Sequence, residues 1–278
     1  MSGLLLAVLA SIGWGTTGML AGRASRSLPP LHVALALEWS GLVMIGLALV
    51  AVRPASGSAG DLGFALAAGV AGALGNVLVY AALSVGAMGL VAPIAAFGAA
   101  IPVIAFGVAG GDRPSGLAVV GMVAALAGGV TVARAPGRAT RRGLGLAVAA
   151  ALSYGLYFSL LDLAADGGAL WATTTSRAMA AAFLAVLAFA VLRHRIRGAE
   201  GRGLVRVMPI GFLDALATLA FAVATTRGLV SLVAVIACLY PITTAALAYA
   251  LLGERLGRWQ AIGAALAVAG VAMIVATA

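Results

Sequence analysis

The chain has 278 residues, of which 63% are apolar and only 9% are charged, and its mean hydropathy is +1.14. A soluble domain of this length needs far more polar surface, so the composition excludes a water-soluble globular protein and predicts an integral membrane protein. The formal charge of +9 comes from 17 arginines without any lysine, and their position in short loops between apolar runs argues against nucleic-acid binding.

Apolar segments of about 20 residues, the length of a helix that crosses ~30 Å of hydrocarbon, recur along the whole chain. Loops rich in glycine and proline separate them, such as Leu28-Pro29-Pro30 and Asp166-Gly167-Gly168. The segments are too long for the strands of a membrane barrel, which are about ten residues long. We therefore predict ten membrane-spanning helices, at residues 2–22, 31–52, 62–84, 88–109, 114–133, 143–163, 170–192, 204–226, 229–251 and 257–276.

The second half of the chain repeats the first. The stretch from Leu229 to Ala276 matches the stretch from Leu90 to Ala133, and Pro241 matches Pro102 at an offset of 139 residues. After the loop that joins the two apolar runs of each stretch the offset becomes 142, and the glycine pairs that then match are Gly121 with Gly263 and Gly128 with Gly270.

Each repeat holds five predicted spans, residues 1–137 forming the first repeat and residues 138–278 the second. Because five is an odd number, the second repeat must lie in the bilayer upside down relative to the first. Inverted repeats are a recurrent design of secondary transporters, in which the two halves alternate access to a site at mid-membrane. The sequence therefore predicts an all-α membrane protein of two inverted-topology five-helix repeats.

Arginines are distributed unevenly between the two ends of the predicted bundle. Loops after even-numbered spans carry Arg53, Arg113 and Arg227, whereas loops after odd-numbered spans, here called the arginine-rich end, carry 13 arginines. Since basic loops stay in the cytoplasm, this count predicts cytoplasmic odd-numbered loops and external termini. The 13 residues are Arg23, Arg26, Arg134, Arg138, Arg141, Arg142, Arg193, Arg195, Arg197, Arg202, Arg206, Arg255 and Arg258.

Several motifs resemble those of one transporter family. They are Trp14-Gly15 in the first span, Leu252-Gly253-Glu254-Arg255-Leu256 followed by Gln260 and Gly263, and two glycines seven residues apart in the tenth span. In this order the chain resembles, over essentially its whole length, the EamA-like branch of the drug/metabolite transporter superfamily. The resemblance implies export of small metabolites, often amino acids or related compounds, from the bacterial cytoplasm. It also implies a cavity lined mainly by spans 1, 3, 4, 6, 8 and 9, and cytoplasmic termini, opposite to the arginine count.

Three charged residues lie well inside the predicted spans, where a charge is costly and marks a candidate functional residue. At 1.5 Å per residue, Glu38 in the second span lies ~12 Å from the arginine-rich end. Arg177 in the seventh span and Asp214 in the eighth reach a common depth, ~12–14 Å from the opposite end, so an ion pair between them is expected. Asn76, late in the third span, comes close to the depth of Glu38.

Two interpretations of these residues remain open. In the functional one, Asp214 or Glu38 binds a substrate amine or accepts a coupling proton, and Arg177 binds a carboxylate. A carboxylate that has lost its hydration is well suited to proton exchange. In the alternative, Arg177 and Asp214 only neutralise one another and lock two spans together, and Glu38 lies in a hydrated crevice near the headgroups.

Aromatic residues midway along the spans are further candidates for the binding site. Trp14 and Tyr154 occupy equivalent places in the first and sixth spans, although aromatic side chains usually gather at the membrane interfaces. Their position favours a cavity wall or gate, with ordinary packing as the alternative. Tyr80, Tyr157 and Tyr240 are expected to line the same cavity, where their hydroxyl groups need hydrogen-bond partners.

Pro102 and Pro241 lie midway along the fourth and ninth spans. Each removes one helical hydrogen bond and frees a carbonyl group, which a neighbouring helix or a hydrated cavity must satisfy. Because both repeats carry the proline at the same place, we predict a hinge or a cavity there rather than a coincidence.

Other kinds of chemistry find little support in the sequence. His32 and His194 lie far apart and Cys238 is the single cysteine, so we expect no metal site, no disulfide and no cofactor. Without lysine there is no phosphate-binding loop for ATP.

We therefore predict a multi-pass protein of the bacterial inner membrane that is a secondary transporter and not an enzyme. It exports a small metabolite by alternating access, driven by the proton gradient or by the gradient of the substrate itself. The partners are a small-molecule substrate and the lipid bilayer, with protons as an open possibility. The alternative is an intramembrane enzyme that acts on a lipid or a lipid-linked substrate.

Overall fold

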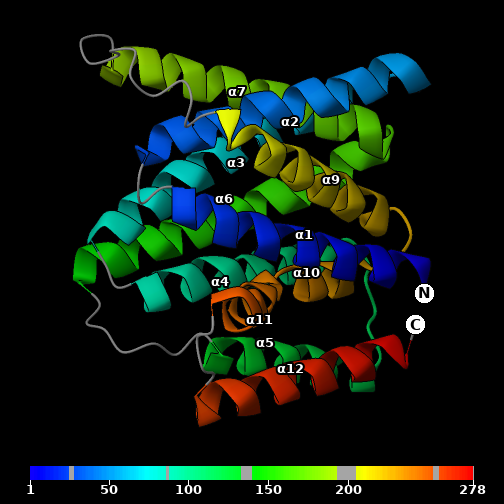
Figure 1. Cartoon of the computed structure of the whole chain (residues 1–278). Coiled ribbons are helices and arrows are strands. Elements are labelled where there is room, and N and C mark those ends of the chain that lie inside the picture. The colour runs from blue at the N-terminus through cyan, green and yellow to red at the C-terminus, as the bar shows by residue number, and fades with distance from the viewer. Residues whose placement is uncertain (25–27, 86–87, 133–139, 193–204, 253–256, 278) are drawn as a thin grey trace.

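A computed structural model of the chain consists of helices and the loops that connect them (Figure 1). It describes residues 1–24, 28–85, 88–132, 140–192, 205–252 and 257–277. The helices of these residues are α1 (Ser2–Ala24), α2 (Pro30–Val52), α3 (Ala59–Val85), α4 (Met88–Ala109), α5 (Gly116–Val132), α6 (Arg141–Ala165), α7 (Ala169–Leu192), α9 (Met208–Thr225), α10 (Val230–Ala237), α11 (Tyr240–Leu252) and α12 (Arg258–Val275).

The lengths and hydropathy of these helices are those of membrane spans. Within the described residues, eight helical segments have 18 residues or more and are apolar enough to cross a bilayer. Two further helices are apolar: α4, Met88–Ala109, and the shorter α5, Gly116–Val132. Together these ten segments coincide with the ten predicted spans to within a few residues at each end. The protein is therefore an all-α, multi-pass membrane protein.

The ninth predicted span is not one continuous helix. The sequence predicts a single helix over residues 229–251, but α10 ends at Ala237 and α11 begins at Tyr240, with a two-residue turn between them. Pro241 favours this break, because it has no amide hydrogen to donate and its ring would collide with the carbonyl group of residue 237 in a continuous helix. The predicted membrane span is therefore present, but two helices joined by a turn next to the proposed hinge residue Pro241 form it.

Helices α5 and α12, which are equivalent in the two repeats, contact each other through glycines. A Cβ atom on Gly128 would lie 2.6 Å from the carbonyl oxygen of Gly263, and the reverse distance is also 2.6 Å. Gly121 and Gly270 face each other in the same way, at 2.7 and 2.5 Å. The early glycine of one helix thus meets the late glycine of the other. Such crosswise pairing requires a two-fold axis perpendicular to the helices, so the two repeats are inverted.

The contacts of α3 with α7 and of α9 with α2 obey the same symmetry. A Cβ atom on Gly69 of α3 would collide with the carbonyl oxygen of Ser176 in α7, and one on Gly211 of α9 would collide with that of Leu37 in α2. These residues match across the repeats, at offsets of 142 for the glycines and 139 for their partners. Helices α2 and α7 pack together at one edge of the bundle, and α5 with α12 form the opposite edge (Figure 1).

The two ends of the bundle differ in how they are filled. The largest cluster of buried apolar residues occupies mainly the half away from the arginine-rich end, here called the closed end. Helix α1 begins and α12 ends at this closed end (Figure 1). Every residue of α10 is buried there, and Oδ2 of Asp112 accepts a hydrogen bond of 2.9 Å from the backbone amide of Ser231. Other members of the cluster are Leu4, Ala7 and Ala10 of α1, Leu161 and Ala164 of α6, and Phe221 and Ala224 of α9.

Candidate functional site

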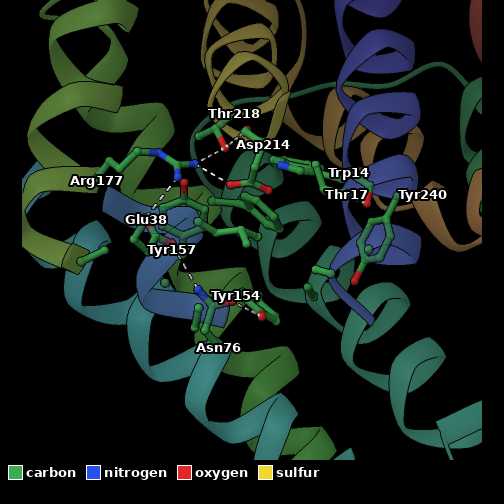
Figure 2. A pocket seen from close by; sticks show the side chains of 18 of the residues that line it. Trp14, Thr17, Glu38, Asn76, Tyr154, Tyr157, Arg177, Asp214, Thr218 and Tyr240 are labelled. Carbon is green, nitrogen blue, oxygen red and sulfur yellow. Dashed lines mark hydrogen bonds and ion pairs between the residues drawn. The ribbon is translucent and has the colours of Figure 1, made fainter. Parts of the chain in front are cut away.

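A cavity of about 190 Å³ lies at the centre of the bundle, and helices of both repeats form its walls (Figure 2). The residues that α6, α7 and α9 contribute lie near the middle of those helices. Those of α1, α2 and α3 extend toward the arginine-rich end and reach Ala21, Ala34 and Asn76. The cavity thus runs from mid-bundle toward the arginine-rich end, whereas apolar side chains fill the closed end.

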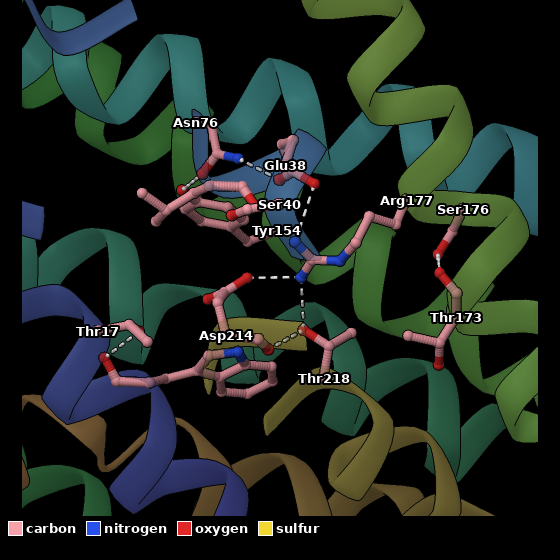
Figure 3. Close-up of polar contacts among 12 residues, drawn as sticks. Thr17, Glu38, Ser40, Asn76, Tyr154, Thr173, Ser176, Arg177, Asp214 and Thr218 are labelled. Atoms are coloured by element: carbon pink, nitrogen blue, oxygen red, sulfur yellow. Dashed lines mark hydrogen bonds and ion pairs between the residues drawn. The ribbon is translucent and has the colours of Figure 1, made fainter. Parts of the chain in front are cut away.

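Arg177 of α7 bridges two carboxylates in this cavity (Figure 3). Its side chain is 5% exposed; Nη1 donates to Oε2 of Glu38 at 3.2 Å, and Nη2 donates to Oδ2 of Asp214 at 2.6 Å. Nη2 also lies 3.4 Å from the hydroxyl of Thr218, one helical turn after Asp214. The expected ion pair of Arg177 with Asp214 is present, and Glu38 joins it. We call Glu38, Arg177 and Asp214 the charged cluster.

A chain of hydrogen bonds extends the charged cluster to α3 and α6. Nδ2 of Asn76 donates to Oε1 of Glu38 at 3.3 Å, and the hydroxyl of Tyr154 donates to Oδ1 of Asn76 at 2.8 Å (Figure 3). The similar depths of Asn76 and Glu38 in the sequence therefore correspond to a direct contact. Because each bond polarises the next, such a network holds its members in one arrangement.

Aromatic rings separate the cavity from the core of the closed end. The ring of Trp14 lies 5.2 Å from that of Phe158, 5.6 Å from Phe221 and 6.5 Å from Tyr240, measured between centroids. Phe221 belongs to the buried cluster of the closed end, and Trp14 and Tyr240 face the cavity (Figure 2). Phe158 belongs to the buried cluster and also lines the cavity. These tilted and edge-on arrangements are favourable for aromatic pairs, so the layer is a well-packed barrier.

Glu38 and Arg177 occupy equivalent positions in the two repeats, 139 residues apart, and yet they contact each other. Two equivalent residues can touch only on the two-fold axis that relates the repeats. For inverted repeats this axis lies in the plane of the membrane, so the contact is at mid-membrane. Identical charges would repel each other on this axis. A charged residue at this position must therefore face a neutral or oppositely charged one, and here an acid faces a base.

The structure brings most of the predicted binding residues around one cavity. The side chain of Tyr80 lies outside the part of the structure that is described, and the hinge residues Pro102 and Pro241 are not among the lining residues. The binding and hinge roles stay predictions. The predicted binding residues that line the cavity are Trp14, Glu38, Asn76, Tyr154, Tyr157, Arg177, Asp214 and Tyr240.

Sequence reasoning missed the hydroxyl and apolar members of the site. Thr218, Thr17 and Phe158 also line the cavity. Two of them carried a signal, because Thr218 and Phe158 follow Asp214 and Tyr154 by four residues and so share their helix faces. Nothing in the sequence marks Thr17 as a member of the site. Its hydroxyl donates to the carbonyl group of Trp14, a bond that a threonine in any apolar helix can make. Across the described residues, no group of three or more His, Cys, Asp or Glu side chains could hold a metal ion.

Comparison with known families accounts for both halves of the chain. The model of the EamA-like transporter family matches twice, over residues 1–134 and 141–276. The chain belongs to the EamA-like transporter family. It is therefore a membrane transporter of the drug/metabolite type that acts on a small molecule, and the alternative of an intramembrane enzyme falls away.

Solved structures show the same fold for this EamA-like protein. Seventeen solved chains match it. One of them, a crystal structure described only as that of a protein, is 20% identical in sequence and superimposes with a TM-score of 0.81 over 98% of this chain and 96% of the other. At this identity the likeness establishes the arrangement of the helices alone. No curated protein matches the chain.

Proposed function

We propose that this EamA-like protein exports a small metabolite, an amino acid or a related compound, from the cytoplasm across the bacterial inner membrane by alternating access. The observation that carries the proposal is the central cavity, which holds a buried charged cluster on the two-fold axis and reaches toward one end of the bundle. Buried charges inside membrane proteins are costly, and they mark substrate and ion pathways.

The distribution of arginine supports a cytoplasmic opening of the cavity. The cavity extends toward the arginine-rich end, and basic loops remain in the cytoplasm during membrane insertion. With this orientation a substrate enters the cavity from the cytoplasm, and the buried α10 and the aromatic layer close the external side. This is the loading state that an exporter requires.

The inverted repeat supports a route to the opposite state. By the offset of 139, α10 corresponds to the first half of α4. The opposite state arises if each repeat, residues 1–137 and 138–278, adopts the arrangement that the other repeat has in this structure. The first half of α4 then closes the arginine-rich end, and the closed end opens. Pro102 and Pro241 lie just beyond these half-helices, where hinges are proposed. The boundary between the repeats falls within residues 133–139, outside the described residues.

Flux through proteoliposomes tests the proposal. Purified protein is reconstituted, the liposomes are loaded with radiolabelled amino acids or small amines, and efflux is followed with and without a pH gradient. Asp214→Asn removes a cavity carboxylate and is expected to lower flux by about tenfold or more. Asp166→Asn changes an exposed acid after α6 and is the matched control, with flux expected to stay unchanged. Folded protein that moves none of these compounds contradicts the proposed function.

A further inference from the structure

The charged cluster has one more acid than base. Glu38 and Asp214 each lie against Arg177, so with both acids ionised the cluster carries a net charge of −1. The other titratable groups that line the described part of the cavity are the tyrosines of α6 and α11, and α1, α3 and α4 contribute none. A buried charge that lacks a counter-charge is unfavourable. The cavity therefore favours one further positive charge.

Arg177 is not available for a carboxylate of the substrate. Both terminal nitrogens of its guanidinium group are bonded to carboxylates, and its Nε atom is buried against protein rather than exposed in the cavity. Among the described lining residues there is no second arginine. A zwitterion or an anion would place its carboxylate beside two acids without a free cation, which opposes its binding.

Asp214, in contrast, has an oxygen that can receive a ligand. Its side chain is 23% exposed, the most of the three members of the cluster, and only its Oδ2 atom is bonded to Arg177. Its Oδ1 atom is the carboxylate oxygen that Arg177 does not bind, and the side chain lines the cavity. Trp14 and Tyr240 present aromatic rings to the same cavity, and such rings attract organic cations.

The size of the cavity limits the ligand further. At about 190 Å³ it is smaller than the pockets of roughly 300–1,000 Å³ that hold drug-sized compounds. A compound of the size of an amino acid fits this space, and a large amphipathic drug does not.

From these observations we propose that the ligand of this cavity is a small organic monocation with a protonated amine, and that it replaces one proton held by the carboxylates of the charged cluster. The proposal rests on the proposed transport function. It narrows the substrate from amino acids and related compounds to amines without a carboxylate, and it names the coupling ion. In the empty cavity one carboxyl group, at Asp214 or Glu38, keeps its proton. When the ammonium group binds, that O–H bond breaks and the proton passes to water at the open end of the cavity. Cation and proton then travel in opposite directions.

A calorimetric titration of detergent-purified protein tests this inference without measuring flux. The probes are three compounds of similar shape and different charge: 3-methylbutylamine as its ammonium ion, leucine, and 4-methylpentanoate. Repeating each titration in buffers of different ionisation enthalpy counts the protons released. We expect the amine to bind at least about tenfold more tightly than the other two and to release close to one proton per site.

Substitutions test whether the charged cluster is responsible for the binding of the amine and for the release of the proton. Asp214→Asn is expected to abolish both the binding of the amine and the release of the proton, while Asp166→Asn leaves both unchanged. Tighter binding of leucine or of 4-methylpentanoate overturns the charge preference, and so does a failure of the amine to bind. Binding of the amine without proton release overturns the exchange. If leucine is nevertheless transported in liposomes, the export function stands and only this inference is lost.

Discussion

The two halves of this transporter share a scaffold but differ in the residues that face the cavity. Gly69 and Gly211 make equivalent contacts, as do the glycines of α5 and α12. At the cavity the correspondence ends, because Glu38 matches Arg177 and Gly72 matches Asp214 at the offsets of their spans. Glycines that pack helices together are therefore the same in both repeats, whereas the charged residues that line the cavity differ between them.

This difference follows from the position of the cavity on the two-fold axis. A residue away from the axis meets a different residue of the other half, so both copies of a glycine contact can persist. A residue on the axis meets its own equivalent, and a charge there would face a like charge. Glu38 and Arg177 resolve that conflict by opposite charge, and Asp214 then makes the cluster acidic.

The equivalent proline-containing spans show a second difference. Helix α4 runs without interruption through Pro93 and Pro102, whereas the matching span is divided into α10 and α11 before Pro241. Helix α4 lines the cavity, whereas α10 closes the opposite end of the bundle. The same proline thus has two outcomes in two surroundings.

The largest expected effect comes from removing the charge on the axis. Arg177→Met leaves Glu38 and Asp214 buried beside each other without a counter-charge. The free energy of unfolding is expected to fall by about 3–5 kcal/mol, the usual cost of breaking a buried ion pair. Thermal or denaturant unfolding of the purified protein in detergent measures the loss.

A neutral cluster is the control for this variant. The triple substitution Glu38→Gln, Arg177→Met and Asp214→Asn removes all three charges, so most of the stability is expected to return while transport stays lost. If Arg177→Met is as stable as the unaltered protein, the charges on the axis are not coupled as described.

An intermediate effect is expected where the halves are alike. Gly128→Ala and Gly270→Ala each place a Cβ atom against the backbone of the opposite helix, so α5 and α12 must move apart. We expect each to lower the free energy of unfolding by about 1–3 kcal/mol, and the two values to be similar because the positions are equivalent. Gly116→Ala in α5 is the matched control, since its Cβ atom meets nothing within 4 Å. Clearly unequal losses at residues 128 and 270 argue against the symmetry.

The smallest effect on stability is expected at the two prolines. Pro102→Ala and Pro241→Ala each restore one helical amide and remove a ring, so we expect unfolding free energies to change by less than about 1 kcal/mol. Their effects on flux are expected to differ: Pro241→Ala lets α10 and α11 join and slows transport several-fold, whereas Pro102→Ala lies in a helix that is already continuous. Equal flux in both variants argues against a hinge at Pro241.

Much of the fold could be predicted from the sequence because its causes are local. Hydrocarbon excludes unpaired polar groups, so runs of apolar residues mark the spans, and the odd number of spans in each repeat requires the inversion. The same exclusion singles out Glu38, Arg177 and Asp214, and helical rise alone places Arg177 level with Asp214. A hinge at Pro241 was predicted, but the interruption of its helix could not be, since a proline is also tolerated inside a continuous membrane helix, as α4 shows.

The sequence by itself determined the ten spans, their inverted repeat and the few polar residues that the membrane tolerates. The tertiary structure alone decided that Glu38 meets its own repeat equivalent, that Asp214 keeps an oxygen toward the cavity, and that one end of the bundle is closed. The physical reason is that these contacts depend on the rotation and spacing of helices. Glycine contacts between residues more than a hundred positions apart set that geometry, and no local pattern records which helix will be the neighbour.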